Sequence, residues 1–284
     1  MFIAKDQATA ERMFAARDRA ADMLEVSRAS DDVTWGWYGR SIGCEVNTHD
    51  DSAWLRVRAV PAGDGYGRMW EGNVKAAREL PAEVQRPHLI RWRDFTADGF
   101  DYRAELFEFV PARICSPEQF LREPLSLPDR WWASLRTSLT ALATVTTDRF
   151  VVSQRYITEK VPYYLEAPDM PTVPPRWAAS HGDLHWANLT VHGPTVLDWE
   201  TWGMAPAGYD AAQLAAFTVF APETQARLRS ELTSFLDTPE GRFAELVVLA
   251  ELLHMTTRGD HVEAADAVRQ RAQALLRFCR RVDW

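Results

Sequence analysis

The stretch HGDLHWANLTVHGPTVLDWE, residues 181–200, is the most informative part of this sequence. Two short runs rich in β-branched and apolar residues, 189–191 and 195–197, flank a turn around Gly193. Short β-prone runs on either side of a glycine-containing turn predict a β-hairpin. A hairpin centred on Gly193 brings Asn188 opposite Asp198, because each lies five residues from the glycine.

The same stretch holds the side chains that phosphoryl transfer needs. Asn188 and Asp198 offer the oxygen ligands that Mg²⁺ prefers. Asp183 lies on the loop that enters the hairpin, where a carboxylate can accept the proton of a hydroxyl group. One proton acceptor beside an amide and a carboxylate that hold metal is the set that kinases use.

The spacing also fits a known catalytic pattern. The kinase loop H-x-D-L-x-x-x-N is matched in this sequence by His181, Asp183, Leu184 and Asn188. Asp198 then stands where the later metal-binding aspartate of kinases would be, although Trp199 and Glu200 replace the Phe-Gly that follows it there. HGDLHWAN followed by VLDWE resembles the motif pair of the aminoglycoside phosphotransferase and choline kinase superfamily.

This resemblance implies a bilobal protein-kinase-like fold and an ATP-dependent small-molecule kinase. Asp183 would be the catalytic base, and Asn188 and Asp198 would bind Mg²⁺. Four further residues are expected to contact substrate or to support the loop: His181, His185, Glu200 and Asp210. His181 would brace the catalytic loop, and Asp210 would cap the following helix and support the loop.

The N-terminal half matches the family more loosely. A glycine-bearing hairpin over the phosphates would use Ser41 and Gly43, although a plain tight turn explains these residues equally well. The strand lysine expected next is replaced in WLRVRAV by arginine. Arg56 aligns best and Arg58 second, and alternation sends both side chains to the same face. Arginine binds phosphate but is not equivalent to lysine.

Two further nucleotide contacts follow from the resemblance. A helix glutamate should pair with the strand cation, and Glu71 fits this place, with Glu79 as the competitor; either could instead be a solvated surface residue. The segment LFEFVPA would be the hinge, where the backbone C=O of Glu108 and N–H of Val110 would contact adenine.

Outside these motifs, the pattern predicts an α+β protein. Strands are expected at 42–47, 53–60, 89–95 and 102–110, and helices at 7–29, 69–80, 129–146, 210–220, 223–236, 241–257 and 262–280. Proline-rich residues 162–176 are expected to be loop. We therefore predict a small antiparallel nucleotide-binding lobe at 1–109 and a larger helical lobe, with the catalytic loop and substrate site, at 110–284.

Composition limits the partners. The 284-residue chain has a net charge of −8, which disfavours nucleic acid and anionic membranes and favours a cationic ligand. Its three cysteines are scattered, and the N-terminal residues lack an apolar signal core, so we expect a cytoplasmic protein without disulfides or structural zinc. The acids Glu159, Glu166 and Asp169 add to the preference for a cation.

The expected acceptor is thus a hydroxyl of a small cationic molecule, foremost an aminoglycoside or basic peptide antibiotic, which would give resistance. A metabolic kinase acting on an alcohol such as choline or homoserine is the alternative. Two readings belong to other classes. His181, Asp183, His185 and Asp198 could ligate two metals in a phosphoesterase, or the missing lysine could mark a non-catalytic pseudokinase-like binding module.

Overall fold

The computed structural model describes residues 3–281, which divide into two compact units. The first unit comprises the chain up to residue 78 and residues 86–112, and the second comprises residues 79–85 and the chain from residue 113 on. Residues 79–85 thus pack with the second unit, although the sequence places them in the N-terminal lobe. The assignment of nucleotide binding to 1–109 and catalysis to 110–284 stays a prediction.

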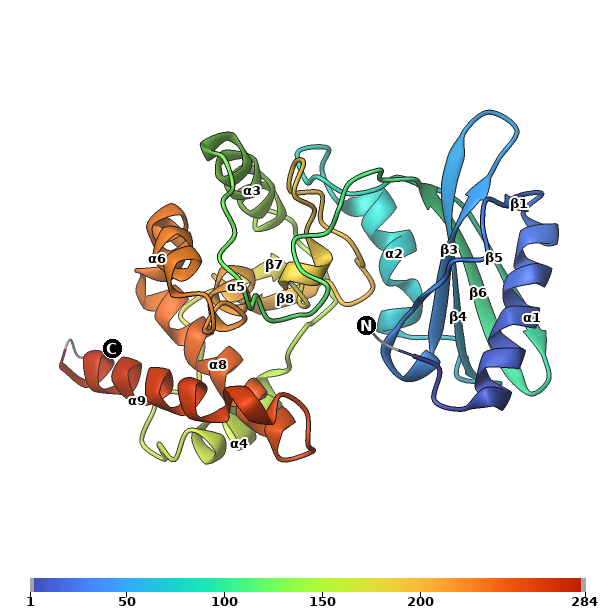
Figure 1. Cartoon of the computed structure of the whole chain (residues 1–284). Coiled ribbons are helices and arrows are strands. Elements are labelled where there is room, and N and C mark those ends of the chain that lie inside the picture. The colour runs from blue at the N-terminus through green and yellow to red at the C-terminus, as the bar shows by residue number, and fades with distance from the viewer. Residues whose placement is uncertain (1–2, 282–284) are drawn as a thin grey trace. The chain divides into compact units, whose positions relative to one another are not determined.

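The first unit is built on a twisted antiparallel sheet (Figure 1). Its strands lie in the order β1-β3-β4-β6-β5, and β2 pairs with β3 beside β1. The bounds are β1 (Ser27–Arg28), β2 (Thr34–Trp35), β3 (Ser41–Asn47), β4 (Ser52–Pro61), β5 (Leu89–Ala97) and β6 (Phe100–Glu108). The β5–β6 turn needs positive φ at Asp98 and Gly99, and Asp-Gly is the dipeptide that such hairpins favour. The four strands predicted here are confirmed.

Helix α1 (Gln7–Met23) covers one face of this sheet (Figure 1). Met13 and Ala20 pack against alternate strand residues such as Leu55 and Val57, all fully buried. The helix is shorter than predicted, because the backbone reverses at Glu25, whose φ is 52°. The N–H of Val26 then bonds back to Ala21 O, a hydrogen-bonded helix end.

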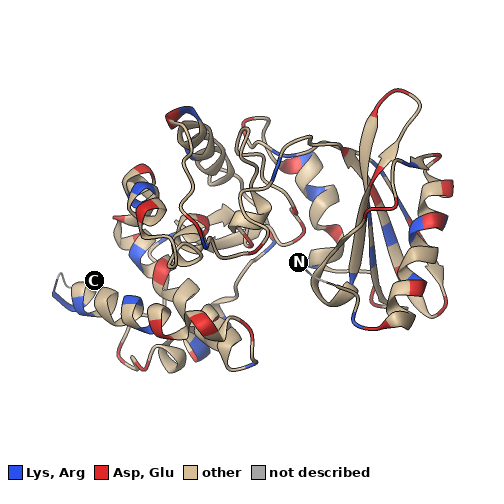
Figure 2. Cartoon of the chain, viewed as in Figure 1, with Lys and Arg blue, Asp and Glu red and all other residues tan. Residues whose placement is uncertain are grey.

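The opposite face of the sheet carries charge. Arg56, Arg58, Arg103 and Glu105 alternate with the buried apolar residues of β4 and β6, and Figure 2 shows basic segments along these strands. Helix α2 (Arg68–Glu79) lies on this face, where Asn73 donates to Glu105 at 2.9 Å. The sheet therefore separates an apolar layer from a layer of paired charges.

The second unit is mainly helical. Its elements are η2 (Trp186–Asn188), η3 (Val262–Ala264), strands β7 (Trp177–Ser180) and β8 (Gly203–Pro206), and helices α3 (Asp129–Leu142), α4 (Gln154–Tyr164), α5 (Tyr209–Ala216), α6 (Pro222–Glu231), α7 (Thr233–Leu236), α8 (Pro239–Thr256) and α9 (Ala265–Arg281). Helix α8 is buried on all sides between Phe243 and Leu253, as its apolar sequence predicts. It packs against α4, α5 and α9.

Three local expectations are wrong. Helix α4 continues through Pro162 into a segment predicted to be loop. The predicted helix 223–236 is divided at Leu232, where α6 ends and α7 begins. The short sheet β7–β8 was not expected, although the loop that holds Asp183 follows directly after β7. Within residues 3–281, no helix has the length and apolar character needed to cross a membrane.

Candidate active site

Asp183 lies on the loop between β7 and η2 in the second unit. Its side chain is 39% exposed, so a substrate atom can reach the carboxylate. One carboxylate oxygen, Oδ2, lies 3.6 Å from Nε2 of His185. The Asp183 carboxylate thus combines solvent access with a histidine neighbour.

The protein keeps Asp183 ionised. Burial alone would raise the pKa of its carboxyl, but His185 first, and then His181 and His261, hold this pKa below the ordinary value. A carboxylate with a lowered pKa carries its negative charge at neutral pH. Such a group can orient a hydroxyl and accept its proton during transfer.

His181 links the loop to the hairpin that follows. The imidazole is fully buried, and this burial lowers its pKa to about 4, so the ring is neutral. Nε2 donates to Leu197 O at 2.9 Å, and Nδ1 accepts the N–H of Asp183 at 3.3 Å. The ring also meets Trp199 edge-on at 4.7 Å between centroids.

Helix α5 holds the backbone of the same loop. Asp210 accepts the N–H groups of His181 at 2.7 Å and Gly182 at 3.0 Å. Gln213, one turn later, accepts from Leu184 N at 2.9 Å and donates to Gly182 O at 3.2 Å. Asp210 therefore supports the loop, as predicted, but does not cap α5 as predicted, because both its carboxylate oxygens accept from the loop backbone.

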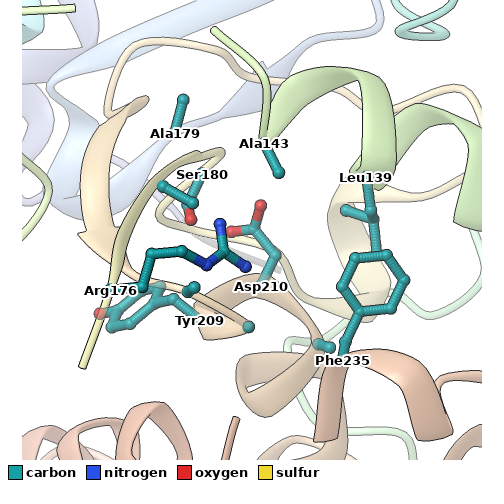
Figure 3. Close-up of a pocket in the computed structure, with 12 residues that line it drawn as sticks. Leu139, Ala143, Arg176, Ala179, Ser180, Tyr209, Asp210 and Phe235 are labelled. Carbon is teal, nitrogen blue, oxygen red and sulfur yellow. The ribbon is translucent and has the colours of Figure 1, made fainter. Parts of the chain in front are cut away.

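Gln213 was not foreseen from the sequence. Its signal is its place three residues after Asp210 on α5, which puts both side chains on one helical face. The Asp210 carboxylate also lines a small cavity of about 40 Å³, with Ser180 and Arg176 nearby (Figure 3). A space of this size is suited to water rather than to a substrate.

The predicted hairpin exists, but its register differs by one residue. Leu189 pairs with Val196 in a single antiparallel bridge, and Leu197 N bonds to Asn188 O at 2.9 Å. Asn188 is therefore opposite Leu197, the neighbour of Asp198. Thr190 causes the shift, because its hydroxyl accepts Thr195 N and donates to Gly193 O, tightening the turn.

Asn188 and Asp198 nevertheless have the chemistry of magnesium ligands. Asn188 Nδ2 donates to Asp183 O at 2.9 Å, so the amide group is held on the loop through its nitrogen. Asp198 has a φ of 62°, in the left-handed region, so the extended backbone of the hairpin ends there. An amide oxygen and a carboxylate fit a hard cation.

His185 carries an unsatisfied buried atom. Its side chain is only 8% exposed, and Nδ1 has no hydrogen-bond partner among the described residues. Nε2 faces Asp183 and the Asn188 amide. A buried nitrogen without a partner marks a place where a ligand or water completes the site.

Arg149 is a second residue that sequence reasoning missed. This arginine is buried and donates to Trp202 O at 2.8 Å and to Glu200 O at 3.0 Å. It thereby holds the backbone that follows Asp198. Glu200 thus contributes its carbonyl group here, and a role of its carboxylate toward substrate or metal stays a prediction.

In the first unit, packing accounts for the two residues predicted to contact phosphate. A Cβ at Gly43 would lie 2.6 Å from the Trp54 indole, so Trp54 requires the glycine. Ser41 Oγ fills the space beside Gly36, whose N–H bonds to Ser41 O at 2.9 Å. Contacts of Ser41 and Gly43 with phosphate stay predictions.

Arg56 does not pair with Glu71 as predicted, but with Glu105. Arg56 bonds to Glu105 on the neighbouring strand at 3.0 Å, whereas Glu71 lies 3.5 Å from Arg103. Arg58 donates to Met69 O at 3.0 Å. The correction has a physical cause, because Arg56 and Glu105 are directly opposite in the β4–β6 register.

Three residues predicted for the nucleotide site remain: Glu79, Glu108 and Val110. Glu79 is exposed at the end of α2. The N–H of Glu108 bonds to His88 O at 2.9 Å, and Val110 O accepts Ala112 N at 2.8 Å. The Glu108 C=O and Val110 N–H contacts with adenine stay predictions.

Among residues 3–281, no group of three His, Cys, Asp or Glu is placed to hold a metal ion.

Known proteins share both the sequence pattern and the fold. The family model described as "Phosphotransferase enzyme family" matches residues 74–246. No curated protein matches the chain.

Among solved structures, a thermostable mutant of aminoglycoside phosphotransferase APH(4)-Ia, in ternary complex with AMP-PNP and hygromycin B, has a TM-score of 0.62 and 14% identity. That similarity covers 93% of this chain and 98% of the other. Spectinomycin phosphotransferase APH(9)-Ia, in complex with ADP and spectinomycin, has a TM-score of 0.54 and 12% identity over 90% of this chain and 93% of that one. These likenesses show a common kinase-like fold.

Proposed function

Given that the chain belongs to the phosphotransferase enzyme family, we propose that it transfers the γ-phosphoryl group of ATP to a hydroxyl of a small cationic molecule. The observation that carries this proposal is Asp183. Its carboxylate is ionised, accessible and held on a loop whose backbone is tied to Asp210 and Gln213. Such a carboxylate has the position and charge of a catalytic base.

In this mechanism the chain's own residues orient and deprotonate the acceptor. The Asp183 carboxylate accepts a hydrogen bond from the acceptor hydroxyl and takes its proton as the oxygen attacks the γ-phosphorus. The bond from this phosphorus to the β–γ bridging oxygen breaks, and ADP leaves with that oxygen. His181 and Asp210 keep the loop in place, so that little reorganisation is needed at the moment of transfer. Asn188 and Asp198 would hold magnesium, which when bound would neutralise phosphate charge.

ATP is the proposed phosphoryl donor. Structures with the same fold contain AMP-PNP or ADP, and the chain retains a cation, Arg56, at the strand position expected to face the phosphates. Ser41, Gly43, Glu108 and Val110 are the other proposed contacts. The cytoplasm, where ATP is abundant, is the proposed location.

A cationic acceptor is supported by side chains near Asp183. Burial first, and then the carboxylates of Glu251, Asp210 and Asp183, raise the pKa of Tyr209, so Glu251 and Asp183 act on the same hydroxyl. Tyr209 donates to Glu251 on α8. Carboxylates close together favour a cation between or beside them.

Aromatic rings of α4 and α8 pack together one helical turn beyond Glu251. His254, one turn after Glu251 on α8, stacks on Tyr164 at 4.6 Å between ring centroids and contacts the Tyr156 hydroxyl at 3.2 Å. Aromatic faces beside a carboxylate bind ammonium groups well. An antibiotic that carries amino groups is the acceptor that this chemistry favours.

The test is a panel assay of ATP-dependent phosphorylation. Purified protein is incubated with ATP, magnesium and one acceptor at a time: hygromycin B, spectinomycin, a basic peptide antibiotic, choline or homoserine. Phosphorylation of an antibiotic and not of choline or homoserine is the expected result. If no antibiotic is phosphorylated, the resistance function is excluded. Phosphorylation of choline or homoserine would establish the metabolic alternative.

A further inference from the structure

The cation at the proposed nucleotide site is held by its own sheet. Arg56 on β4 and Glu105 on β6 are directly opposite in an antiparallel register that runs from Ala53–Glu108 to Pro61–Phe100. Arg56 Nη1 lies 3.0 Å from Glu105 Oε2. The Glu105 side chain is 2% exposed and that of Arg56 15%, so solvent screens this pair weakly.

Helix α2 contributes an amide to the pair. Asn73 is buried, and its Nδ2 donates to the same Glu105 Oε2 at 2.9 Å. The oxygen that bonds Arg56 is therefore fixed from two sides. A hydrogen bond in which donor or acceptor is charged is stronger than one between neutral groups.

The glutamate in the first turn of α2 is engaged elsewhere. Glu71 lies 3.5 Å from Arg103. Arg103 itself is bound by Asp94 at 2.7 Å and donates to Trp70 O at 2.5 Å. The helix thus presents Asn73, and not a carboxylate, toward the Arg56–Glu105 pair.

We propose that Glu105, held by Asn73, is the positioning residue for Arg56 and takes the place of the helix glutamate implied by the family resemblance. This proposal rests on the proposed function, because Arg56 is there the contact to the ATP phosphates. A guanidinium carries its five N–H donors in one planar fork, so the bond to Glu105 fixes the orientation of the whole group. Since β4 and β6 are locked in register, the sheet sets the position of the cation and α2 contributes one amide.

The direct test is nucleotide binding by Glu105→Gln. This substitution keeps the size of the side chain but removes the charge that orients Arg56. Calorimetry with AMP-PNP and ADP should show affinity reduced about tenfold or more, the loss expected for one charge-assisted hydrogen bond. With an acceptor from the panel, KM for ATP should rise while KM for the acceptor stays within about twofold.

Asp94→Asn is the matched control. It also removes a carboxylate from a buried arginine of the same sheet, Arg103, but leaves the Arg56–Glu105 pair intact. We expect a lower melting temperature and unchanged nucleotide affinity. An equal loss of nucleotide affinity in Asp94→Asn would show that general damage to the sheet explains the effect, and would overturn the proposal.

A rescue variant separates positioning from folding. In Asn73→Glu with Glu105→Gln, the carboxylate moves to α2, where residue 73 already reaches the Arg56 pair. Nucleotide affinity should recover at least in part. A double variant that melts like the wild type but binds nucleotide no better than Glu105→Gln would contradict the proposal.

If Glu105→Gln fails to fold, the nucleotide affinity of Asn73→Ala tests the proposal instead. It retains the ion pair and removes one bond to Glu105, so a smaller loss of nucleotide affinity in the same direction is expected, and affinity equal to the wild type overturns the inference. Failure of the proposed function looks different, because the wild-type protein would then bind neither AMP-PNP nor ADP. Binding by the wild type with equal binding by Glu105→Gln refutes the positioning role alone.

Discussion

His181 and Asp210 are buried titratable residues whose pKa values shift in opposite directions. Burial lowers the pKa of His181 from 6.5 to about 4 and raises that of Asp210 from 3.8 to about 6. The folded-state His181 binds fewer protons than the unfolded one, so its stabilising contribution is lost as pH falls from 6.5 to 4. Asp210 contributes stability below pH 3.8 that is lost as pH rises through 6.

Asp210→Asn should therefore steepen the acid sensitivity of the protein. Each shift corresponds to roughly 3 kcal/mol, and the two contributions oppose each other in the wild type. The variant keeps one acceptor oxygen at residue 210 but no longer titrates there. Of the two opposing titrations, only that of His181 then remains. Urea unfolding between pH 6.5 and 4 should show a larger fall in stability than in the wild type, and parallel pH profiles would contradict this account.

Arg149 should be among the residues most sensitive to truncation. Arg149→Met leaves the carbonyls of Glu200 and Trp202 without their buried donor, at a cost of about 2 kcal/mol or more in unfolding free energy. Arg155→Met is the control, because Arg155 is 83% exposed and pairs with Glu159 on its own helix. Denaturant titration of both variants would refute this account if their losses were equal.

At the scale of elements, the β3–β4 hairpin is shaped by the packing of Trp54 against Gly43. The two residues are diagonal neighbours, two register positions apart, since Gly43 is opposite Arg56 and Trp54 is opposite Glu45. The indole occupies the place where a Cβ at residue 43 would lie. The glycine is therefore required by the fold, whatever its contact with phosphate.

Gly43→Ala should destabilise the protein by roughly 1–3 kcal/mol through overpacking. Adding Trp54→Ala removes the clashing ring, so the double variant should be more stable than the sum of the two single losses implies. Thermal or urea unfolding of the wild type, both single variants and the double variant completes this double-mutant cycle. Additive losses would mean that the indole does not determine the residue at position 43.

The sequence predicts these elements unevenly, for physical reasons. The β5–β6 hairpin was readable because Asp98-Gly99 favours its turn. Strands β7 and β8 were missed, because four-residue strands 22 residues apart carry no local period. Helix α4 was missed because Pro162 stands near its C-terminal end, where the tertiary contacts with α8 override the breaker.

The residues of the candidate site were also predicted unevenly from the sequence. Asp183, Asn188 and Asp198 were found because one short segment holds them, although the register of their hairpin is shifted by the Thr190 hydroxyl. Gln213 and Arg149 act across about 30 and 50 residues of chain. Glu105 replaced Glu71 as the partner of Arg56, because strand pairing and not helix position decides that contact.

On the scale of the whole molecule, each of the two compact units has buried apolar residues of its own. The first unit's core joins α1 to its sheet. In the second unit, Glu245 on α8 is buried between Arg229 at 2.5 Å and Arg271 at 2.7 Å, and these charges lower its pKa against the raising effect of burial. Helices α6, α8 and α9 are thereby tied together.

Glu245→Ala should destabilise the second unit selectively. Two half-buried arginines lose the buried carboxylate that they share, and this costs less than the roughly 3–5 kcal/mol of breaking a fully buried pair. Differential scanning calorimetry should resolve two transitions, of which the variant lowers one. An equal shift of both transitions would contradict the independence of the two cores.

The central claim, that the Asp183 carboxylate accepts the proton of the acceptor hydroxyl, is tested most directly by the rate of phosphoryl transfer in Asp183→Asn. Radiolabelled ATP and the acceptor identified by the panel would be mixed with wild type and variant, with AMP-PNP affinity measured in parallel. Transfer should fall by a factor of about 100 or more while AMP-PNP affinity and melting temperature stay close to the wild type. Transfer at the wild-type rate in Asp183→Asn would contradict the account.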